Sequence, residues 1–117
     1  MKALSVRQPW ANMIASGEKT IETRTWATDY RGDLLICSSK SPKIEPAGFA
    51  LCVVRLVDCV PMQPEHEAAA RCACYPGAYA WLLEDVRLIS RFPVKGRLGL
   101  FEVEPPEFRR DFRFESE

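Results

Sequence analysis

The sequence predicts a mainly β domain with two or more short helices, an α+β class in which the strands close into a small antiparallel β-barrel. Three observations lead to this class. Short apolar runs recur along the 117 residues and are separated by glycine and proline. Two stretches have helical spacing, and both are short. The chain has no strand–helix–strand rhythm and no internal repeat, so we do not expect a parallel sheet.

Length and composition are those of one ordinary globular domain. The chain is 47% hydrophobic and 27% charged. Its formal net charge is zero, which argues against a protein that coats long duplexes but allows a local basic cleft for a nucleotide or a flipped base. No apolar run approaches the ~18 residues that span a bilayer, and the start lacks a secretion signal. We therefore expect a cytoplasmic location and no membrane partner.

The chain begins with a strand and a helix. Residues 2–6 form the first strand pattern, and residues 9–16 predict a helix of about two turns, with proline at its first position. Gly17 suits the left-handed residue that ends a helix. Trp10 and Ile14 share one helical face. Trp10 could be a stacking platform for a base, but its place on this face makes packing in the core the expected role.

The next strand pattern, residues 20–25, carries charges. Alternation along a strand places Glu22, Arg24 and Trp26 on one face and Thr23 on the other. Beyond it, four further strand patterns cover residues 34–38, 49–60, 79–89 and 98–103. The length of the second of these, and the glycine at 48 before it, predict a bulge or bend.

The remaining elements are a second helix and a tail. Residues 64–72 predict a short helix, with proline at its start and an arginine late in it. We assign residues 1–104 to a single domain and residues 105–117 to a charged C-terminal tail. The tail holds Phe108, Phe112 and Phe114. The sequence leaves open whether it is loose or docks its aromatic side chains against the barrel.

Lys19, Glu22 and Arg24 are the first candidates for a functional site. Charges on a strand that enters a core are costly unless they are paired or meet a ligand. One interpretation is a partly exposed ion-pair cluster at a strand edge, worth ~0–1 kcal/mol per pair. The other is a nucleotide site, in which Lys19 and Arg24 face a phosphate or carbonyl oxygen and Glu22 faces an exocyclic amine.

The residues around this trio resemble a known family. Residues 4–11, the Gly-x-Lys-x-x-Glu-x-Arg pattern of residues 17–24, and the runs 79–86 and 92–96 are similar to the ASCH domain. That family is named for a homology domain of a transcriptional coactivator, and the resemblance covers roughly residues 3–103. It implies a PUA-like β-barrel with a charged cleft that binds RNA, another nucleic acid or a modified nucleoside, with no cofactor.

Some members of this family are enzymes, which supplies the alternative function. One branch hydrolyses the acetyl amide of acetylcytidine, and another is described as ribonuclease-like. The amidohydrolase branch carries a threonine nucleophile where Glu22 stands here, and neither Thr20 nor Thr23 can replace it without shifting the geometry. The alternative is therefore a small hydrolase that uses Lys19 and Glu22, with Glu22 as general base and Glu84 as a candidate acid. We favour binding over catalysis.

Four further residues complete the predicted ligand-binding set. Trp26 could stack on a base or pack in the core. Arg31 and Lys40 could rim the cleft, and Ser39 could supply a hydroxyl. For these last three, simple exposure at the surface fits the sequence equally well. A turn at residues 91–97 holds three more basic residues, which either contact phosphates or are merely solvated.

The cysteines predict no metal site. The five cysteines include the pair Cys72 and Cys74, with His66 upstream. Zinc sites usually combine two such pairs, and the second pair is missing. We expect reduced thiols. A third functional interpretation, weaker than the other two, is a protein-interaction module in which the tail docks on a protein partner.

Overall fold

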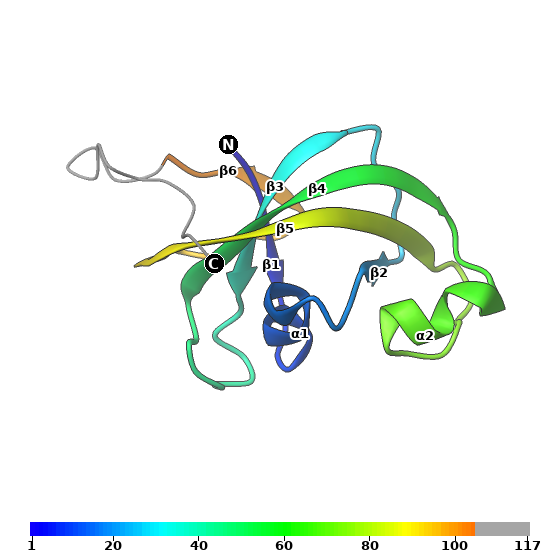
Figure 1. Ribbon diagram of the computed structural model, residues 1–117, viewed down its shortest axis with the longest axis horizontal. Coiled ribbons are helices and arrows are strands. Elements are labelled where there is room, and N and C mark those ends of the chain that lie inside the picture. Colours follow the sequence, from blue (N-terminus) through cyan, green and yellow to red (C-terminus); the bar gives the residue numbers. More distant parts are fainter. Residues whose placement is uncertain (105–117) are drawn as a thin grey trace.

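A computed structural model describes residues 1–104, which form one strongly curved β-sheet with short helical segments packed against it (Figure 1). The predicted tail, residues 105–117, lies outside the described residues. The elements in chain order are β1 (Lys2–Val6), α1 (Trp10–Ser16), β2 (Ile21–Arg24), β3 (Gly32–Ser38), β4 (Phe49–Pro61), the 3₁₀ turn η1 (Pro64–His66), α2 (Glu67–Ala70), β5 (Tyr79–Pro93) and β6 (Leu100–Glu102).

The six strands have the order β2-β5-β4-β3-β1-β6. Neighbouring strands are antiparallel except for β1 and β3, which pair in parallel. This confirms the predicted class, mainly β with short helices, in the form of a half-barrel. Because β2 and β6 stand at the two ends of the order, β2 pairs only with β5 within the described residues and keeps one edge free. The candidate site residues Glu22 and Arg24 lie on this strand, and Lys19 lies just before it.

The curvature comes from irregular pairing in the two longest strands. β4 has 13 residues and β5 has 15. Their register shifts at three places, the first between Ala50 and Cys52. Each β-bulge adds a residue on one strand, bends it and increases its twist. The bulge predicted for this long run is confirmed, and Figure 1 shows β4 and β5 arching over α1.

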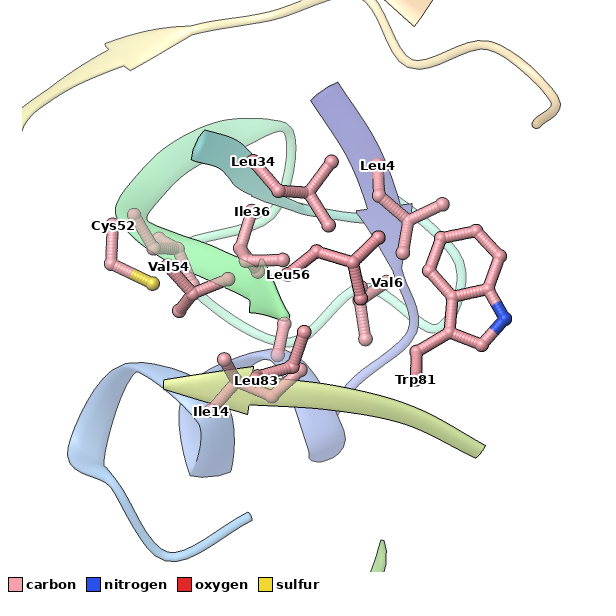
Figure 2. Close-up of a cluster of buried hydrophobic side chains, with 12 residues drawn as sticks. Leu4, Val6, Ile14, Leu34, Ile36, Cys52, Val54, Leu56, Trp81 and Leu83 are labelled. Atoms are coloured by element: carbon pink, nitrogen blue, oxygen red, sulfur yellow. The ribbon is translucent and has the colours of Figure 1, made fainter. Parts of the chain in front are cut away.

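Helix α1 fills the concave face of the sheet. Ala11 and Ile14 of this helix are fully buried, and Figure 2 shows Ile14 in the same apolar cluster as Leu83 and Trp81. Trp81 is also fully buried. The prediction for Trp10 is wrong, because 37% of its surface is exposed. A helix of two turns covers little of the sheet, and its first residue extends beyond the edge of the contact.

The start of α1 differs in detail from the prediction. Pro9 caps the helix from outside its first turn, and Gln8 completes the cap. The Asn12 amide donates to the Gln8 side-chain oxygen at 3.0 Å, and the Gln8 side-chain amide donates to the Ser38 hydroxyl at 2.9 Å. Gln8 therefore fixes α1 to β3. The predicted end of the helix is confirmed, since Gly17 has a φ of +86°.

The second helix is shorter than predicted. One 3₁₀ turn and one α-helical turn replace the expected helix, and Arg71 ends them with a φ of +59°. This short α2 lies against β2 (Figure 1). Its main consequence is that the carbonyl of Ala70 is left free of helical bonds. Among the described residues, no helix is long and apolar enough to cross a membrane.

Candidate functional site

The Gly-x-Lys-x-x-Glu-x-Arg pattern of residues 17–24 is the signature of this chain. Its three charged residues, Lys19, Glu22 and Arg24, lie together at one cavity of about 320 Å³. We call it the signature cavity. It opens beside the free edge of β2, where the end of β1, the start of α1 and the segment after α2 meet. Its lining consists of Ser5, Val6, Arg7, Trp10, Lys19, Glu22, Thr23, Arg24, Cys72 and Tyr75.

Lys19 is held at the back of this cavity by its backbone and by its side chain. Its amide donates to the Met13 carbonyl at 3.0 Å, which ties it to α1. Its ammonium donates to the Ala70 carbonyl at the end of α2 and lies 3.4 Å from the Glu22 carboxylate. Only 1% of the side chain is exposed. Burial lowers the pKa of Lys19, and the opposite charge of Glu22 partly offsets this effect.

Glu22 joins the two cations. Its Oε1 faces Lys19, and its Oε2 lies 2.9 Å from the guanidinium of Arg24. Arg24 also donates to the Ser5 carbonyl on β1 at 2.9 Å, so its planar head spans the gap between β2 and β1. Two cations and one carboxylate leave this trio with one net positive charge. The trio therefore presents positive charge to the cavity.

Thr23 also lines the signature cavity, which the strict alternation of a strand did not predict. The cavity wraps around the free edge of β2, so side chains from both faces of the strand contribute to it. Tyr75 donates its hydroxyl hydrogen bond to Thr23 Oγ1 at 3.1 Å, and the Cys72 sulfur lies 3.8 Å from the same oxygen. Thr20, by contrast, is exposed and does not line the cavity.

A second, larger cavity of about 580 Å³ adjoins the first. We call it the basic groove. It is lined by Ser5, Arg7, Arg24, Gly48 and the segments 37–41 and 94–99. Ser5, Arg7 and Arg24 line both cavities. The two hollows are therefore parts of one continuous depression in the surface.

The other predicted site residues divide between this depression and the rest of the surface. Ser39 and Lys40 line the basic groove. Trp26 instead packs edge-on against Trp81, with ring centres 4.8 Å apart. Arg31 donates to the carbonyls of Thr28 and Tyr30 and pairs with Asp58, outside both cavities.

Glu84, the candidate acid partner, is also distant from the trio. It is exposed, and its carboxylate lies 3.3 Å from Arg55 on the neighbouring strand. It lines neither cavity. The prediction that Glu84 serves as the acid partner of Glu22 therefore has no support in the geometry.

Several lining residues were not predicted. Trp10, Arg7 and Tyr75 line the signature cavity although none was assigned to a site. Arg7 directly follows the first strand, and Tyr75 stands next to a Pro-Gly turn. Strand ends and loops are where binding residues concentrate, so their positions were the available signal.

The cysteines form no metal centre in residues 1–104. No group of three His, Cys, Asp or Glu side chains there is arranged to hold an ion, and all five thiols are free. Burial raises the pKa of Cys37 and of Cys52 to about 12. Cys72 differs from these two, because it is only half-buried and lines the signature cavity.

Comparison with known proteins gives consistent matches. The family model described as "ASCH domain" matches residues 4–93. Activating signal cointegrator 1 from Homo sapiens is 24% identical over 127 residues, and the protein of the same name from Mus musculus is 23% identical. Each alignment covers 86% of this chain and 22% of the relative. The chain thus spans about a fifth of the length of these relatives.

Solved structures give the same result for the fold. The crystal structure of ASCH from Zymomonas mobilis superposes with a TM-score of 0.71 at 17% sequence identity, covering 88% of this chain and 87% of that one. At this identity the likeness concerns the fold alone. The half-barrel described above is therefore the same fold as that of this ASCH protein.

Proposed function

This chain belongs to the ASCH domain family, and from that premise we propose that it binds RNA, or a modified nucleoside within RNA, with a base held in the signature cavity. The PUA-like fold of the family is generally associated with RNA binding. For this chain, we propose the identity of the ligand and the residues that contact it. A cytoplasmic location belongs to the same proposal.

The charged trio at the cavity, two of whose members are buried, is the observation that carries the proposal. Lys19 and Glu22 are almost fully buried, yet both line an open cavity instead of lying in a closed core. A volume of about 320 Å³ is at the small end of ligand sites, which suits a single base or nucleoside. The charged groups suit the polar edge of a base, because a cation binds a carbonyl oxygen and a carboxylate binds an exocyclic amine.

Trp10 supports the same assignment. Its ring lines the cavity and is 37% exposed at the start of α1. Aromatic side chains that remain exposed at a concave surface are the usual platforms on which unpaired bases stack. Thr23 and Tyr75 add hydroxyls on another wall. The cavity therefore combines a flat apolar surface with charged and neutral hydrogen-bonding groups.

Titration with short single-stranded RNA tests the proposal. The anisotropy of a labelled pentamer should rise on binding, and free nucleosides, including acetylcytidine, should compete. Thr23→Val removes one hydroxyl from the cavity while keeping the shape of the side chain. It should weaken the binding of both the RNA pentamer and the nucleosides. Glu65→Gln, an exposed residue of η1 away from both cavities, is the control. The proposal fails if no strand or nucleoside binds at low salt.

Hydrolysis of an acylated cytidine or of RNA is the second candidate. The lowered pKa of Lys19 favours it, because catalytic lysines are often tuned by burial. Against it, both oxygens of Glu22 face cations, and a general base needs a free oxygen directed at water. Incubation with acetylcytidine and with end-labelled RNA distinguishes the two functions. Turnover that is lost in Lys19→Met and Glu22→Gln would establish the hydrolase.

The curated relatives also suggest a protein partner. Both are named signal cointegrators, but this chain matches only about a fifth of their length. We therefore propose nucleic acid as the ligand in preference to a protein partner. The family model, which matches residues 4–93, includes the signature cavity and the basic groove apart from its segment 94–99.

A further inference from the structure

Four cations surround the basic groove without any acidic partner. In residues 1–104, the side chains of Arg7, Lys40, Lys95 and Arg97 form no ion pair and no hydrogen bond with the protein. None of the residues that line the groove is acidic. The chain as a whole has sixteen basic and sixteen acidic residues, so this local excess is not a consequence of composition.

Cations on the rest of the described surface are largely paired. Lys2 pairs with Glu102, Arg55 with Glu84, and Arg87 lies 2.7 Å from Asp33. Like charges that gather on one concave surface repel one another and raise the local concentration of anions. Such a cluster fits a ligand that carries several negative charges.

Glycine allows the walls of the groove to close around these cations. A side chain at position 48 would place its Cβ 2.8 Å from Cε of Lys40, so the Lys40 stem lies directly over Gly48. A Cβ at Gly96 would lie 3.1 Å from the Ser5 hydroxyl oxygen. The basic loop 94–99 therefore approaches β1 closely at Gly96. Close packing at these two glycines therefore helps to fix the positions of the groove cations.

Arg24 connects the groove to the signature cavity. It pairs with Glu22 on one side and donates to the Ser5 carbonyl on the other, and it lines both cavities. We infer that the basic groove binds the phosphodiester backbone of a single nucleic-acid strand whose base occupies the signature cavity. This inference rests on the proposed function, and it names a strand, instead of a free nucleoside, as the ligand.

An acidic peptide is the main competing ligand, and two observations favour the phosphodiester. Guanidinium groups bind phosphate oxygens through two parallel hydrogen bonds, and the guanidinium groups of Arg7 and Arg97 line the groove without a partner in residues 1–104. The groove also continues into a cavity that a base would fill, and a peptide backbone offers no equivalent group. A long duplex is disfavoured by the zero net charge of the chain.

Salt dependence of binding is the sharpest test, carried out on the full chain with a labelled RNA pentamer. If four cations each neutralise one phosphate, the plot of log affinity against log salt should have a slope of about −3. Affinity should then fall about 50-fold between 50 and 200 mM salt. Lys40→Gln, Lys95→Gln and Arg97→Gln should each flatten the slope by about 0.7.

Lys43→Gln is the matched control. Lys43 is exposed in the same loop as Lys40 but does not line the groove, so its loss should leave the slope unchanged. Free nucleosides, which have no phosphate, should bind the groove variants as they bind the wild type. Each variant should keep the unfolding midpoint of the wild type, because these four side chains have no protein partner in the described residues.

Each outcome decides between the two proposals. If nucleosides bind but the groove variants leave the slope for RNA unchanged, the inference is overturned and the proposed function stands. If the slope responds to the groove variants but nucleosides and cavity variants have no effect, the groove is confirmed and the base site is overturned. An acidic peptide that displaces the pentamer at lower concentration than unlabelled RNA overturns the inference in favour of a protein ligand. Absence of any binding overturns both.

Discussion

The Lys19 ammonium lies 3.4 Å from the Glu22 carboxylate, with 1% and 9% of the two side chains exposed. Removing two charges from water is costly, and their attraction repays that cost only when further hydrogen bonds satisfy both groups. Here the Ala70 carbonyl completes the environment of Lys19, and Arg24 completes that of Glu22. The pair is thus held from three elements, β2, the segment before it, and α2.

Removing one member of this pair should destabilise the domain. Glu22→Gln leaves the buried Lys19 ammonium without its counter-charge, and we expect a loss of about 3 kcal/mol in the free energy of unfolding. Urea denaturation measures it. The double variant Lys19→Met with Glu22→Gln should recover much of the loss, because no unpaired charge stays buried. A loss below about 0.5 kcal/mol in the single variant would show that the pair is in effect a surface pair.

The lowered pKa of Lys19 predicts a pH dependence of stability with a definite sign. The unfolded chain holds this proton with the ordinary pKa of 10.5, and the folded chain holds it with a lower one. Between the two values the unfolded state binds more protons, so the contribution of Lys19 to the free energy of unfolding rises with pH. Below the lowered value, both states are protonated and the contribution is constant at its minimum.

Comparison with Lys19→Met isolates this contribution. The difference in unfolding free energy, wild type minus variant, should increase from neutral pH toward pH 10.5. Titration of the buried thiols changes both proteins alike and cancels in the difference. A difference that stays flat or declines over this range would mean that the folded state does not disfavour the charged lysine.

The sequence was most informative about local patterns and least informative about where segments meet. The strands and the end of α1 at Gly17 followed from apolar runs and glycine chemistry, which depend on near neighbours. Thr23 did not follow, because its place at the cavity depends on β2 having a free edge. Trp10 has the spacing of a core residue, and only the short contact of α1 with the sheet explains its exposure. Tyr75 reaches the cavity because α2 ends at Arg71.

Thiol labelling should separate the five cysteines into two groups. Cys37 and Cys52 are buried with pKa values raised to about 12, so they hold almost no reactive thiolate near pH 8. Cys59, Cys72 and Cys74 are half-buried and should react first with iodoacetamide. Peptide mass spectrometry identifies the sites, and urea should expose the slow pair.

The same two thiols predict a loss of stability in strong alkali. Their folded pKa values lie above the ordinary 9.0, so the stability they contribute is complete below pH 9 and is lost as pH rises toward 12. Cys52→Ala should show a shallower loss over this range than the wild type. Labelling of Cys37 or Cys52 as fast as Cys72 in the folded protein would contradict the burial on which both expectations rest.

Trp10 provides the most direct optical test of the base site. Of the three tryptophans, all within residues 1–104, Trp10 lines the signature cavity, whereas Trp26 and Trp81 line neither that cavity nor the basic groove and pack edge to face against each other. A base stacked on Trp10 should quench its fluorescence, and Trp10→Phe should remove the quenching while keeping most of the affinity. Trp10→Ala should weaken RNA binding by about 1–3 kcal/mol, the usual worth of one stacked base.

Stability measurements make this result interpretable. Because Trp10 is 37% exposed at the first residue of α1, Trp10→Ala should lower the free energy of unfolding by no more than about 1 kcal/mol. Trp81→Phe is the contrasting variant, since it alters a fully buried ring in the core and should destabilise the fold while leaving the ligand-induced quenching in place. If Trp10→Ala binds RNA as tightly as the wild type, stacking on this ring is excluded and the base lies elsewhere in the cavity.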